Sequence, residues 1–475
     1  MMKIKKLHRD LPIFLIKKRY WYLAYAPGRP QWLSPAEAER FAGYLNHLPA
    51  PAGLELPAAA SQLIEAAAAA KSRWQELASA PFTPECLTVY LSNKCNLSCR
   101  YCFAANENGR CGEQGISQNT IRHGADSKLP VINEQTVQTA AHAVAKICQK
   151  KNKRFTLVLH GGGEPTLHWK LLQAIVACTR KIAHEYGLEW WAYIATHGVL
   201  PKNRAEWLAD HFNLIGLSCD GPANIQNDQR PMMNGQPTFQ IVKRTANLFA
   251  QRGVPFAIRA TITPNSFHRQ KDIVALFCCE FKAKTIRFEP VYLTNHSRSE
   301  GFQKQAAREF VESFVEAQKT AHSMGANLSM SGVRTEEIHG PYCHLFRNVL
   351  HLTPDGTATV CFLTVDSRSS NGPSMKIGEE IFQPDPGFAL NHPRVAQLRQ
   401  QAARIPRRCL DCVNIYHCAR DCPDVCLLQT DDRGEGGFRC QVNKLAVRAW
   451  FSEMFRSRQV SSTTQNRKEK ILTTE

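Results

Sequence analysis

The sequence predicts an α/β fold built on a parallel sheet, with a small α+β region before it and a cysteine-rich region after it. Between residues about 85 and 320, short apolar runs alternate with amphipathic helical stretches, which is the pattern of β/α units joined into a parallel sheet. The runs are rich in Val, Ile and Leu, as strands buried on both faces are. At 475 residues the chain is long enough for more than one domain and for a sizeable core.

The predicted N-terminal region covers residues 1–84. It contains an extended aromatic stretch, RYWYLAYAPGRPQWL, whose APGRP centre is typical of a hairpin turn. Ser34, Pro35 and Glu37 then predict a helix start, with an N-cap, a proline at the first position and an acid in the first turn. An Ala-rich helix, ASQLIEAAAAAKSRWQELA, leads on to the sheet. This region is therefore expected to be a small strand-and-helix domain.

Six strands are readable in the central region, with helical patterns between them. The clearest helical patterns are EQTVQTAAHAVAKICQK and TFQIVKRTANLFAQRG. Parallel strands joined in this way bring their carboxyl ends to one edge of the sheet, where ligands bind in such folds. The expected strands are CLTVYL, TLVLH, WAYIAT, LIGLSC, AIRATIT and TIRFEPV.

Three cysteines with the spacing CxxxCxxC follow the first strand. Cys95, Cys99 and Cys102 can hold a [4Fe–4S] cluster and leave one iron without a protein ligand. Zinc and ferredoxin sites usually have a fourth Cys or His close by. Cys111 does not fit that role, because it lies in a Gly/Asn/Gln-rich stretch that reads as a loop. The alternative is a set of reduced structural thiols.

A glycine-rich turn follows the second strand, in HGGGEPTL. Glycines allow the backbone to approach a ligand closely, although an ordinary strand-to-helix loop is the alternative. Further along, Ser218 ends the strand NLIGLSC, and Asp220, Gly221 and Arg230 belong to the segment after it.

These segments resemble the radical SAM superfamily. In that family the open iron chelates S-adenosylmethionine, and one-electron cleavage gives a 5′-deoxyadenosyl radical that abstracts a hydrogen atom from substrate. The resemblance implies a partial (β/α)6 barrel at residues 85–325, open at the side where substrate enters. It nominates Tyr101 as the aromatic beside the adenine and Ser218 as the ribose contact, while Arg230 is a further contact of less certain role. The motif for the methionyl amino group is Gly161, Gly162, Gly163, Glu164 and Pro165. The resemblance nominates no catalytic acid or base.

The last third of the chain contains a second cysteine set in the order C…Gx4C, Cx2Cx5Cx3C and C. A CxxC pair alone most often means structural zinc, but seven cysteines in this order after a CxxxCxxC triplet fit zinc poorly. They resemble the SPASM extension of radical SAM enzymes, which binds two auxiliary [4Fe–4S] clusters, giving three in all. This domain is expected at 340–455, and the polar residues 456–475 are expected to be a disordered tail. The resemblance assigns Cys343, Cys361 and Cys422 to the first auxiliary cluster, and Cys409, Cys412, Cys418 and Cys440 to the second. Cys426 is the open candidate for the missing fourth ligand of the first.

Enzymes with this second set act mostly on peptides or proteins, so the resemblance implies a precursor peptide or protein substrate. It also implies a reducing partner such as flavodoxin or ferredoxin. Sulfatase maturases have an Asp directly after the Gx4C cysteine, whereas this chain has Phe362 there and its nearest acid at Asp366. We therefore favour a maturase of ribosomal peptides that installs a crosslink or another oxidative modification. The alternatives are formylglycine formation at Cys or Ser, and an iron–sulfur electron-transfer protein. The N-terminal region is either a leader-peptide-binding domain or a packing cap.

Composition limits the remaining possibilities. Eighteen cysteines without a signal peptide indicate metal ligation in a reducing compartment, so we expect a cytoplasmic protein without a membrane span. The formal charge of +18 fits an acidic partner or, as we prefer, a solvated basic surface. Nucleic acid is disfavoured, because no basic stretch is interleaved with aromatics and no binding motif is present.

Overall fold

The computed structural model describes residues 2–46, 58–102, 104, 129–291, 300–367, 372–381, 387–422, 426, 428 and 436–472. Contacts divide the chain into two compact units, which we call unit 1 and unit 2. Unit 1 consists of Met1–Ala80, Gly332–Pro341 and Ala403–Glu475, and unit 2 of Pro81–Ser331 and Tyr342–Ala402. The predicted cysteine-rich region, 340–455, thus contributes to both units. Among the described residues, no helix is both long and apolar enough to span a bilayer.

Unit 2 is built on one sheet, which has eleven strands among the described residues, in the order β11-β10-β9-β8-β7-β6-β5-β12-β13-β14-β15. Every neighbouring pair from β11 to β12 is parallel. The six predicted strands therefore lie side by side in chain order, as the α/β prediction requires. Their bounds are β5 (Cys86–Val89), β6 (Phe155–Leu159), β7 (Trp190–Thr196), β8 (Leu214–Ser218), β9 (Phe256–Ile262) and β10 (Thr285–Pro290), and β11 (Asn327–Ser329) extends them.

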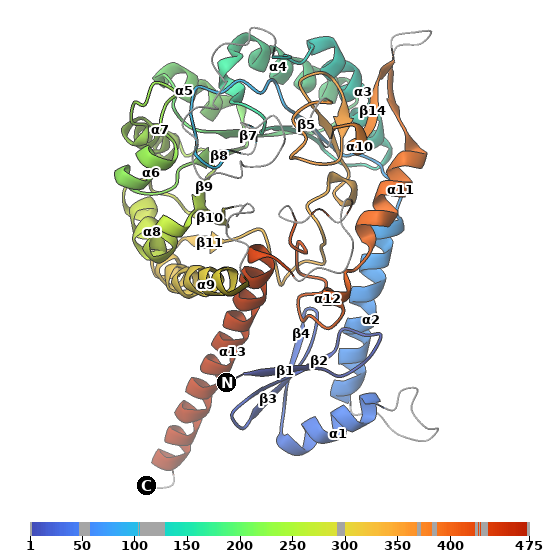
Figure 1. The fold of residues 1–475 in the computed structure, drawn as a ribbon, viewed down its shortest axis with the longest axis vertical. Coiled ribbons are helices and arrows are strands. Elements are labelled where there is room, and N and C mark those ends of the chain that lie inside the picture. Colours follow the sequence, from blue (N-terminus) through green and yellow to red (C-terminus); the bar gives the residue numbers. More distant parts are fainter. Residues whose placement is uncertain are drawn as a thin grey trace. The chain divides into compact units, whose positions relative to one another are not determined.

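Helices follow each of these six strands, and Figure 1 shows them on the outer side of the curved sheet. Asn133 caps the first by accepting the Gln135 N–H at 2.9 Å, and this helix has the bounds predicted from the sequence. One face of these strands is fully buried, with no exposed area at Leu157 and Leu159 of β6 or at Ile194 of β7, whereas the alternate residues of β6 and β7 are partly exposed. The helices are α3 (Glu134–Lys150), α4 (Trp169–Glu185), α5 (Lys202–His211), α6 (Ala223–Gln229), α7 (Phe239–Gln251), α8 (Gln270–Cys279) and α9 (Glu300–Ser323), with short 3-10 turns η2 (Pro165–Leu167) and η3 (Pro264–Arg269).

Beyond β5 the sheet continues in a way that the sequence did not predict. Strand β12 pairs with β5 in parallel, and the following strands are antiparallel. The extension is β12 (Val349–Leu352), β13 (Ala358–Thr359), β14 (Lys376–Ile381) and β15 (Gly387–Leu390), with η5 (His344–Phe346), α10 (Gly372–Met375) and α11 (His392–Ala403) beside it. The described edges of the sheet are β11 and β15, so the barrel is partial.

Unit 1 joins the two ends of the chain. Its antiparallel sheet is β1 (Lys3–Lys6), β2 (Phe14–Lys18), β3 (Trp21–Ala26) and β4 (Arg29–Leu33), and its helices are α1 (Pro35–Asn46), α2 (Ala58–Ser79), α12 (Arg407–Leu410) and α13 (Phe438–Leu472). The predicted APGRP turn joins β3 to β4. Ser34 and Glu37 form a reciprocal cap at the start of α1, at 3.3 and 2.7 Å.

Both faces of the unit 1 sheet are covered. One face packs on α1 and α2 through residues such as Ile13, Ala24 and Leu63. The other face, with Phe14 and Tyr25, packs on α13 through residues such as Val447, Phe451 and Phe455. Helix α13 continues to Leu472 and so enters 456–475, the segment predicted to be disordered; that disorder stays a prediction.

Candidate active site

The CxxxCxxC loop begins where β5 ends. It is fixed against the segment after α6, because Ser98 N–H donates to the Pro231 carbonyl at 2.9 Å and Arg100 N–H to the Gln229 carbonyl at 3.1 Å. The Leu97 N–H points at the Cys95 sulfur at 3.4 Å. The described loop therefore has a fixed course up to Cys102, with all three cysteines half-buried.

The chemistry of these three thiols fits an iron–sulfur cluster. Burial raises the pKa of Cys99 to about 12 and raises that of Cys95 as well. The charges of the neighbouring thiols raise these pKa values further. Such thiols become thiolates only beside a cationic partner, which iron would supply. Among the described residues, no three His, Cys, Asp or Glu side chains are grouped to hold one ion. A four-iron cluster differs, because each cysteine binds a different iron and the sulfurs stand further apart.

The glycine-rich turn packs directly on the cysteine loop. Gly163 N–H donates to the Ser92 carbonyl at 2.8 Å, and the next residue, Glu164, donates its N–H to the Lys94 carbonyl at 2.9 Å. A Cβ on Gly163 would lie 1.9 Å from the Lys94 carbonyl oxygen, and Gly161 has a φ of +80°. The glycines are therefore required, in this structure, by the approach of two backbone loops to each other.

Glu164 lies at the centre of a buried network that sequence reasoning missed. Its carboxylate accepts from Thr166 N–H (3.2 Å) and hydroxyl (2.7 Å), from the Thr196 hydroxyl (2.9 Å) and from His197 N–H (2.9 Å). The His197 ring in turn contacts the Asn96 side-chain oxygen at 2.7 Å, inside the cysteine loop. Three of these described donors meet Oε1 and one meets Oε2, so Oε2 keeps acceptor capacity for a further donor. The signal was the polar pair Thr196–His197 at the end of β7.

Tyr101, Asp220 and Arg230 form a second buried group. The Tyr101 hydroxyl donates to the Asp220 carboxylate, and Arg230 Nε lies 3.1 Å from the other oxygen of Asp220. The Arg230 guanidinium stands 5.4 Å from the centre of the Tyr101 ring, and its Nη1 is 3.9 Å from the Cys99 sulfur. Burial, followed by the Asp220 charge, raises the pKa of Tyr101, so its hydroxyl stays protonated and able to donate. Ser218 is half-buried at the end of β8.

The carboxyl ends of four neighbouring strands thus contribute to one place. The cysteine loop follows β5, Glu164 follows β6, His197 follows β7 and Asp220 follows β8. These strands are adjacent in the order β8-β7-β6-β5. The arrangement is a ligand site at the carboxyl edge of a parallel sheet, with three thiols, a buried cation and hydrogen-bonding groups around it.

In unit 2, Cys343 and Cys361 stand on either side of the β12–β13 hairpin. They are neighbours, because His344 N–H donates to the Val360 carbonyl at 3.0 Å. Beside them is a buried ring cluster, in which the Tyr90 ring lies 4.1 Å from that of His351 and the His351 ring lies 5.1 Å from that of His344. Cys422, the third predicted ligand of the first auxiliary cluster, belongs to unit 1.

The four cysteines assigned to the second auxiliary cluster all lie in unit 1. Cys440 begins α13, and its N–H donates to the Asp421 carboxylate at 2.9 Å. The Asn443 amide and the Arg420 N–H donate to the Cys418 sulfur at 3.2 and 3.3 Å. Burial raises the pKa of Cys440 to about 12, and neighbouring thiols, Cys409 and Cys412, add to this. Residues 423–425 and 427, which flank Cys426, lie outside the described residues.

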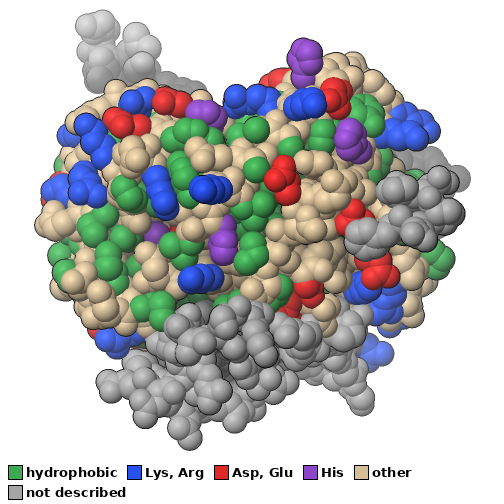
Figure 2. All heavy atoms as spheres, turned by 90° about the horizontal axis from the view of Figure 1, so that it is seen from above, with side chains coloured by type: hydrophobic (Ala, Val, Ile, Leu, Met, Phe, Trp, Pro, Cys, Tyr) green, Lys and Arg blue, Asp and Glu red, His purple; other side chains and the backbone are tan. Residues whose placement is uncertain are grey.

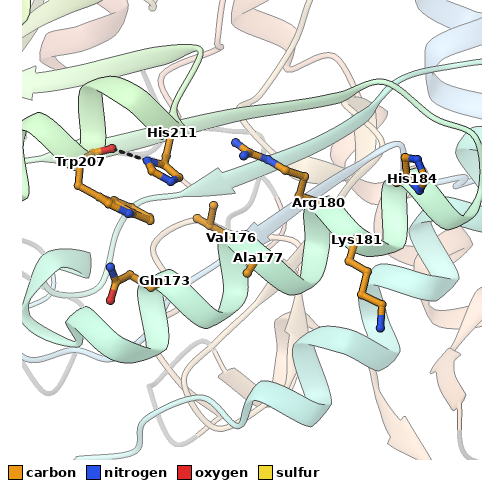
Figure 3. Close-up of a pocket in the computed structure, with 8 residues that line it drawn as sticks. All are labelled: Gln173, Val176, Ala177, Arg180, Lys181, His184, Trp207 and His211. Atoms are coloured by element: carbon orange, nitrogen blue, oxygen red, sulfur yellow. Dashed lines mark hydrogen bonds between the residues drawn. The ribbon is translucent and has the colours of Figure 1, made fainter.

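Neither the face in Figure 2 nor a groove between α4 and α5 marks a second site among the described residues. On the face in Figure 2, Lys and Arg side chains are scattered among others and form no single patch. A groove of about 630 Å³ lies between α4 and α5 and is lined by apolar side chains such as Val176 and Trp207 and by polar ones such as Arg180 (Figure 3). Its residues come from the outer helices, not from the loops that contain the cysteines.

The fold and the site define an α/β protein with a cofactor site at the carboxyl edge of a partial barrel. Residues 89–276 match the family model of the radical SAM superfamily. This segment of the chain is similar to that superfamily, and the similarity implies a [4Fe–4S] cluster and S-adenosylmethionine as cofactors.

The chain is similar in sequence to an anaerobic sulfatase-maturating enzyme and similar in fold to the solved structures of anSMEcpe. Over 202 residues the chain is 28% identical to the cysteine-type anaerobic sulfatase-maturating enzyme of Clostridium perfringens, covering 42% of this chain and 48% of that one. The chain therefore matches about half the length of its curated relatives. The solved structure of native anSMEcpe with bound AdoMet matches with a TM-score of 0.58 and 20% identity, over 78% of this chain and 99% of that one. The structure of native anSMEcpe with bound AdoMet and a Cp18Cys peptide has a TM-score of 0.57 and 19% identity, over 79% of this chain and 99% of that one.

Proposed function

We propose that this protein is a radical SAM maturase that modifies a precursor peptide or a protein. The observation that supports this best is the joining of the cysteine loop, the glycine-rich turn and the Tyr101–Asp220–Arg230 group at one edge of the sheet. A plain electron carrier has no need of a cofactor pocket beside its cluster. The bound cofactor would supply one-electron cleavage of a sulfonium and removal of a hydrogen atom from substrate.

The residues at this edge have distinct tasks in the proposal. Cys95, Cys99 and Cys102 hold the cluster, and the Arg230 guanidinium, 3.9 Å from the Cys99 sulfur, offsets its negative charge. The backbone from Gly161 to Pro165, with Glu164, faces the methionyl amino group. Tyr101 lies against the adenine and Ser218 contacts the ribose.

Auxiliary clusters are the second part of the proposal. Cys343, Cys361 and Cys422 hold one and leave an iron open unless Cys426 completes it. Cys409, Cys412, Cys418 and Cys440 hold the other, which is supported by their burial and mutual electrostatic influence. Their role is to accept the second electron when the substrate radical is oxidised. The first electron would come from a reducing partner such as flavodoxin or ferredoxin.

A peptide substrate is supported by the relative that binds one, anSMEcpe with its Cp18Cys peptide. Formylglycine formation is the second candidate and has less support, because Phe362 takes the place of the Asp that follows the Gx4C cysteine in sulfatase maturases. Its ring packs edge-on against Tyr342, with 6.2 Å between ring centres. A hydrophobic ring at this point cannot act as a base. We therefore favour a crosslink or another oxidative modification.

The test is cleavage of S-adenosylmethionine by reconstituted, reduced protein under anaerobic conditions. We expect 5′-deoxyadenosine from the native chain and none above background from Cys99→Ala. Iron should fall from roughly twelve to roughly eight per chain, as the loss of one of three four-iron clusters requires. Cys178→Ala, a half-buried cysteine of α4 outside all three sets, is the control and should keep both. Unchanged iron and cleavage in Cys99→Ala would contradict the proposal. A Cys-containing peptide that gains an aldehyde would favour the second candidate.

A further inference from the structure

The link between Cys418 and Cys422 has an unusual backbone. Arg420 and Asp421 have φ values of +56° and +70°, so two consecutive non-glycine residues adopt the left-handed conformation. Such a conformation is costly for residues with a Cβ and persists where the surroundings impose it. Glycine would fit both positions without strain, so the two side chains must each have a reason to be present.

Asp421 has an evident structural role. Its carboxylate accepts the N–H of Gly437 at 2.6 Å and that of Cys440 at 2.9 Å. These N–H groups lie at the start of α13, where a helix has no carbonyl of its own to accept them. A carboxylate there accepts their hydrogen bonds and complements the helix dipole. Asp421 therefore fixes the position of Cys440, one of the four proposed ligands of the second auxiliary cluster.

Among the described residues, Arg420 has no comparable hydrogen-bond partner. Its side chain is among the largest fully buried ones, and none of its three guanidinium nitrogens has a hydrogen-bond partner among the described residues. The Arg420 guanidinium carbon lies over the Trp74 ring of α2, 4.0 Å from its centre. Gly340 makes room for that ring, because a Cβ there would stand 2.5 Å from it.

A buried guanidinium without an acceptor is strongly unfavourable, because the lost hydration is not replaced. The cation–π contact with the Trp74 ring replaces only a part of the lost hydration energy. The described groups that act on the charge of Arg420 from nearby are Cys409, Cys418 and Tyr416. Protonated thiols and a phenol supply no negative charge, whereas thiolates on iron do. As thiolates in an iron–sulfur cluster, Cys409 and Cys418 would supply a counter-charge to Arg420.

We propose that Arg420 is a positioning residue that faces the second auxiliary cluster and raises its reduction potential. This inference rests on the proposed function, since it requires Cys409, Cys412, Cys418 and Cys440 to hold that cluster. Arg420 stabilises the reduced form more than the oxidised form, because reduction adds one electron and so one negative charge beside the guanidinium. The electron is the one lost by the substrate radical, so Arg420 favours its transfer from substrate to cluster.

The experiment is a potentiometric EPR titration of the reconstituted full-length protein. The signal of the second auxiliary cluster is identified as the one lost in Cys412→Ala. Arg420→Gly removes the charge and also relieves the backbone strain, so it is the variant expected to fold well. We expect it to keep its iron and to lower the equilibrium constant for reduction of this cluster at least tenfold, a shift of about 59 mV to more negative potential.

Two controls separate charge from packing. Arg420→Lys keeps a positive charge and should shift the potential less than Arg420→Gly. Arg456→Met removes an exposed charge 16 residues after Cys440 on α13, roughly 24 Å away along the helix, and should leave the potential unchanged. Loss of four irons in Arg420→Gly but not in Arg420→Lys would support the same role, since the charge is then needed for assembly.

Three results would overturn the inference. One is an unchanged potential in Arg420→Gly with full iron. The second is equal shifts in Arg420→Gly and Arg456→Met, which would mean that net charge alone matters. The third is loss of iron in both Arg420 variants, which would make its shape the important property. If instead the native chain and Cys412→Ala contain the same iron, the proposed second cluster itself is wrong.

Discussion

Replacement of Glu164 by Gln tests whether this carboxylate serves the cofactor, the fold or both. One oxygen, Oε1, accepts from the Thr166 backbone and hydroxyl and from Thr196. Among the described donors, Oε2 accepts from the His197 N–H, and it lies 3.4 Å from the His197 ring Nε2. The amide nitrogen of the new side chain should therefore take the place of Oε2, because fewer hydrogen bonds are lost there than at Oε1. It then faces the buried His197 N–H, and two donors oppose each other.

The magnitude follows from these contacts. A buried donor left without an acceptor costs about 1–3 kcal/mol, and the remaining bonds weaken when the charge is lost. Relief from burying a charge offsets a part of this, so we expect a loss of unfolding free energy of about 2–3 kcal/mol. A charge-assisted bond to the methionyl amino group, worth about 1.5–3 kcal/mol, would also disappear. S-adenosylmethionine binding should then weaken roughly ten- to a hundred-fold, with all clusters kept.

Two assays separate the two roles. Anaerobic urea unfolding measures the stability, and calorimetric titration with S-adenosylmethionine, together with iron analysis, measures the binding site. Thr196→Val is the matched control, because it removes one donor to Glu164 and keeps the carboxylate; it should lower stability and change the affinity less. If Glu164→Gln loses stability but binds S-adenosylmethionine as tightly as the native protein, Glu164 is structural and the placement of the methionyl group is refuted.

Three further changes have defined outcomes. Gly163→Ala places a Cβ 1.9 Å from the Lys94 carbonyl oxygen, so the cysteine loop must move, and we expect about four fewer irons by chemical analysis; a normal iron content would contradict this. Cys426→Ala should keep its iron and activity if the first auxiliary cluster has an open iron, and a loss of about four irons would show that Cys426 closes it. Burial holds the pKa of His160 at about 4, below the 6.5 of an unfolded histidine. The neutral ring therefore contributes to the unfolding free energy at pH 7, and this contribution is lost as the pH falls from 6.5 towards 4. Between pH 7 and pH 5 this group alone should lower the unfolding free energy by about 2 kcal/mol, and His160→Leu should flatten that part of the measured pH profile.

The sequence was sufficient for the parts of the fold that depend on local pattern. The six parallel strands, the bounds of α3 and the cap of α1 by Ser34 and Glu37 all follow from hydrophobic period and capping residues. The cysteine loop and the glycine-rich turn were expected at strand ends, and the structure brings them together at one edge of the sheet. Such features depend on residues a few positions apart, so a single sequence displays them.

Features that depend on distant residues could not be predicted in this way. The pairing of β12 with β5 joins residues more than 250 positions apart, and no local pattern specifies that register. The Glu164 carboxylate finds Thr196 and His197 on the next strand only after the sheet has formed. The left-handed backbone at Arg420 and Asp421 runs against their own preferences and is imposed by Trp74 and by the start of α13.

The composition of unit 1 has a consequence for how the protein is made. Phe14 and Tyr25 in the N-terminal sheet are covered by Phe451 and Phe455, which a ribosome adds 371 and 375 residues after Ala80. At about 5–20 residues per second, that face of the sheet stays uncovered for roughly 20–75 s during synthesis. The first strands to emerge are therefore among the last to complete their packing, because they pack on α13, the same helix that contains Cys440. We expect chaperones to bind this exposed apolar face of the nascent chain until α13 has been synthesised.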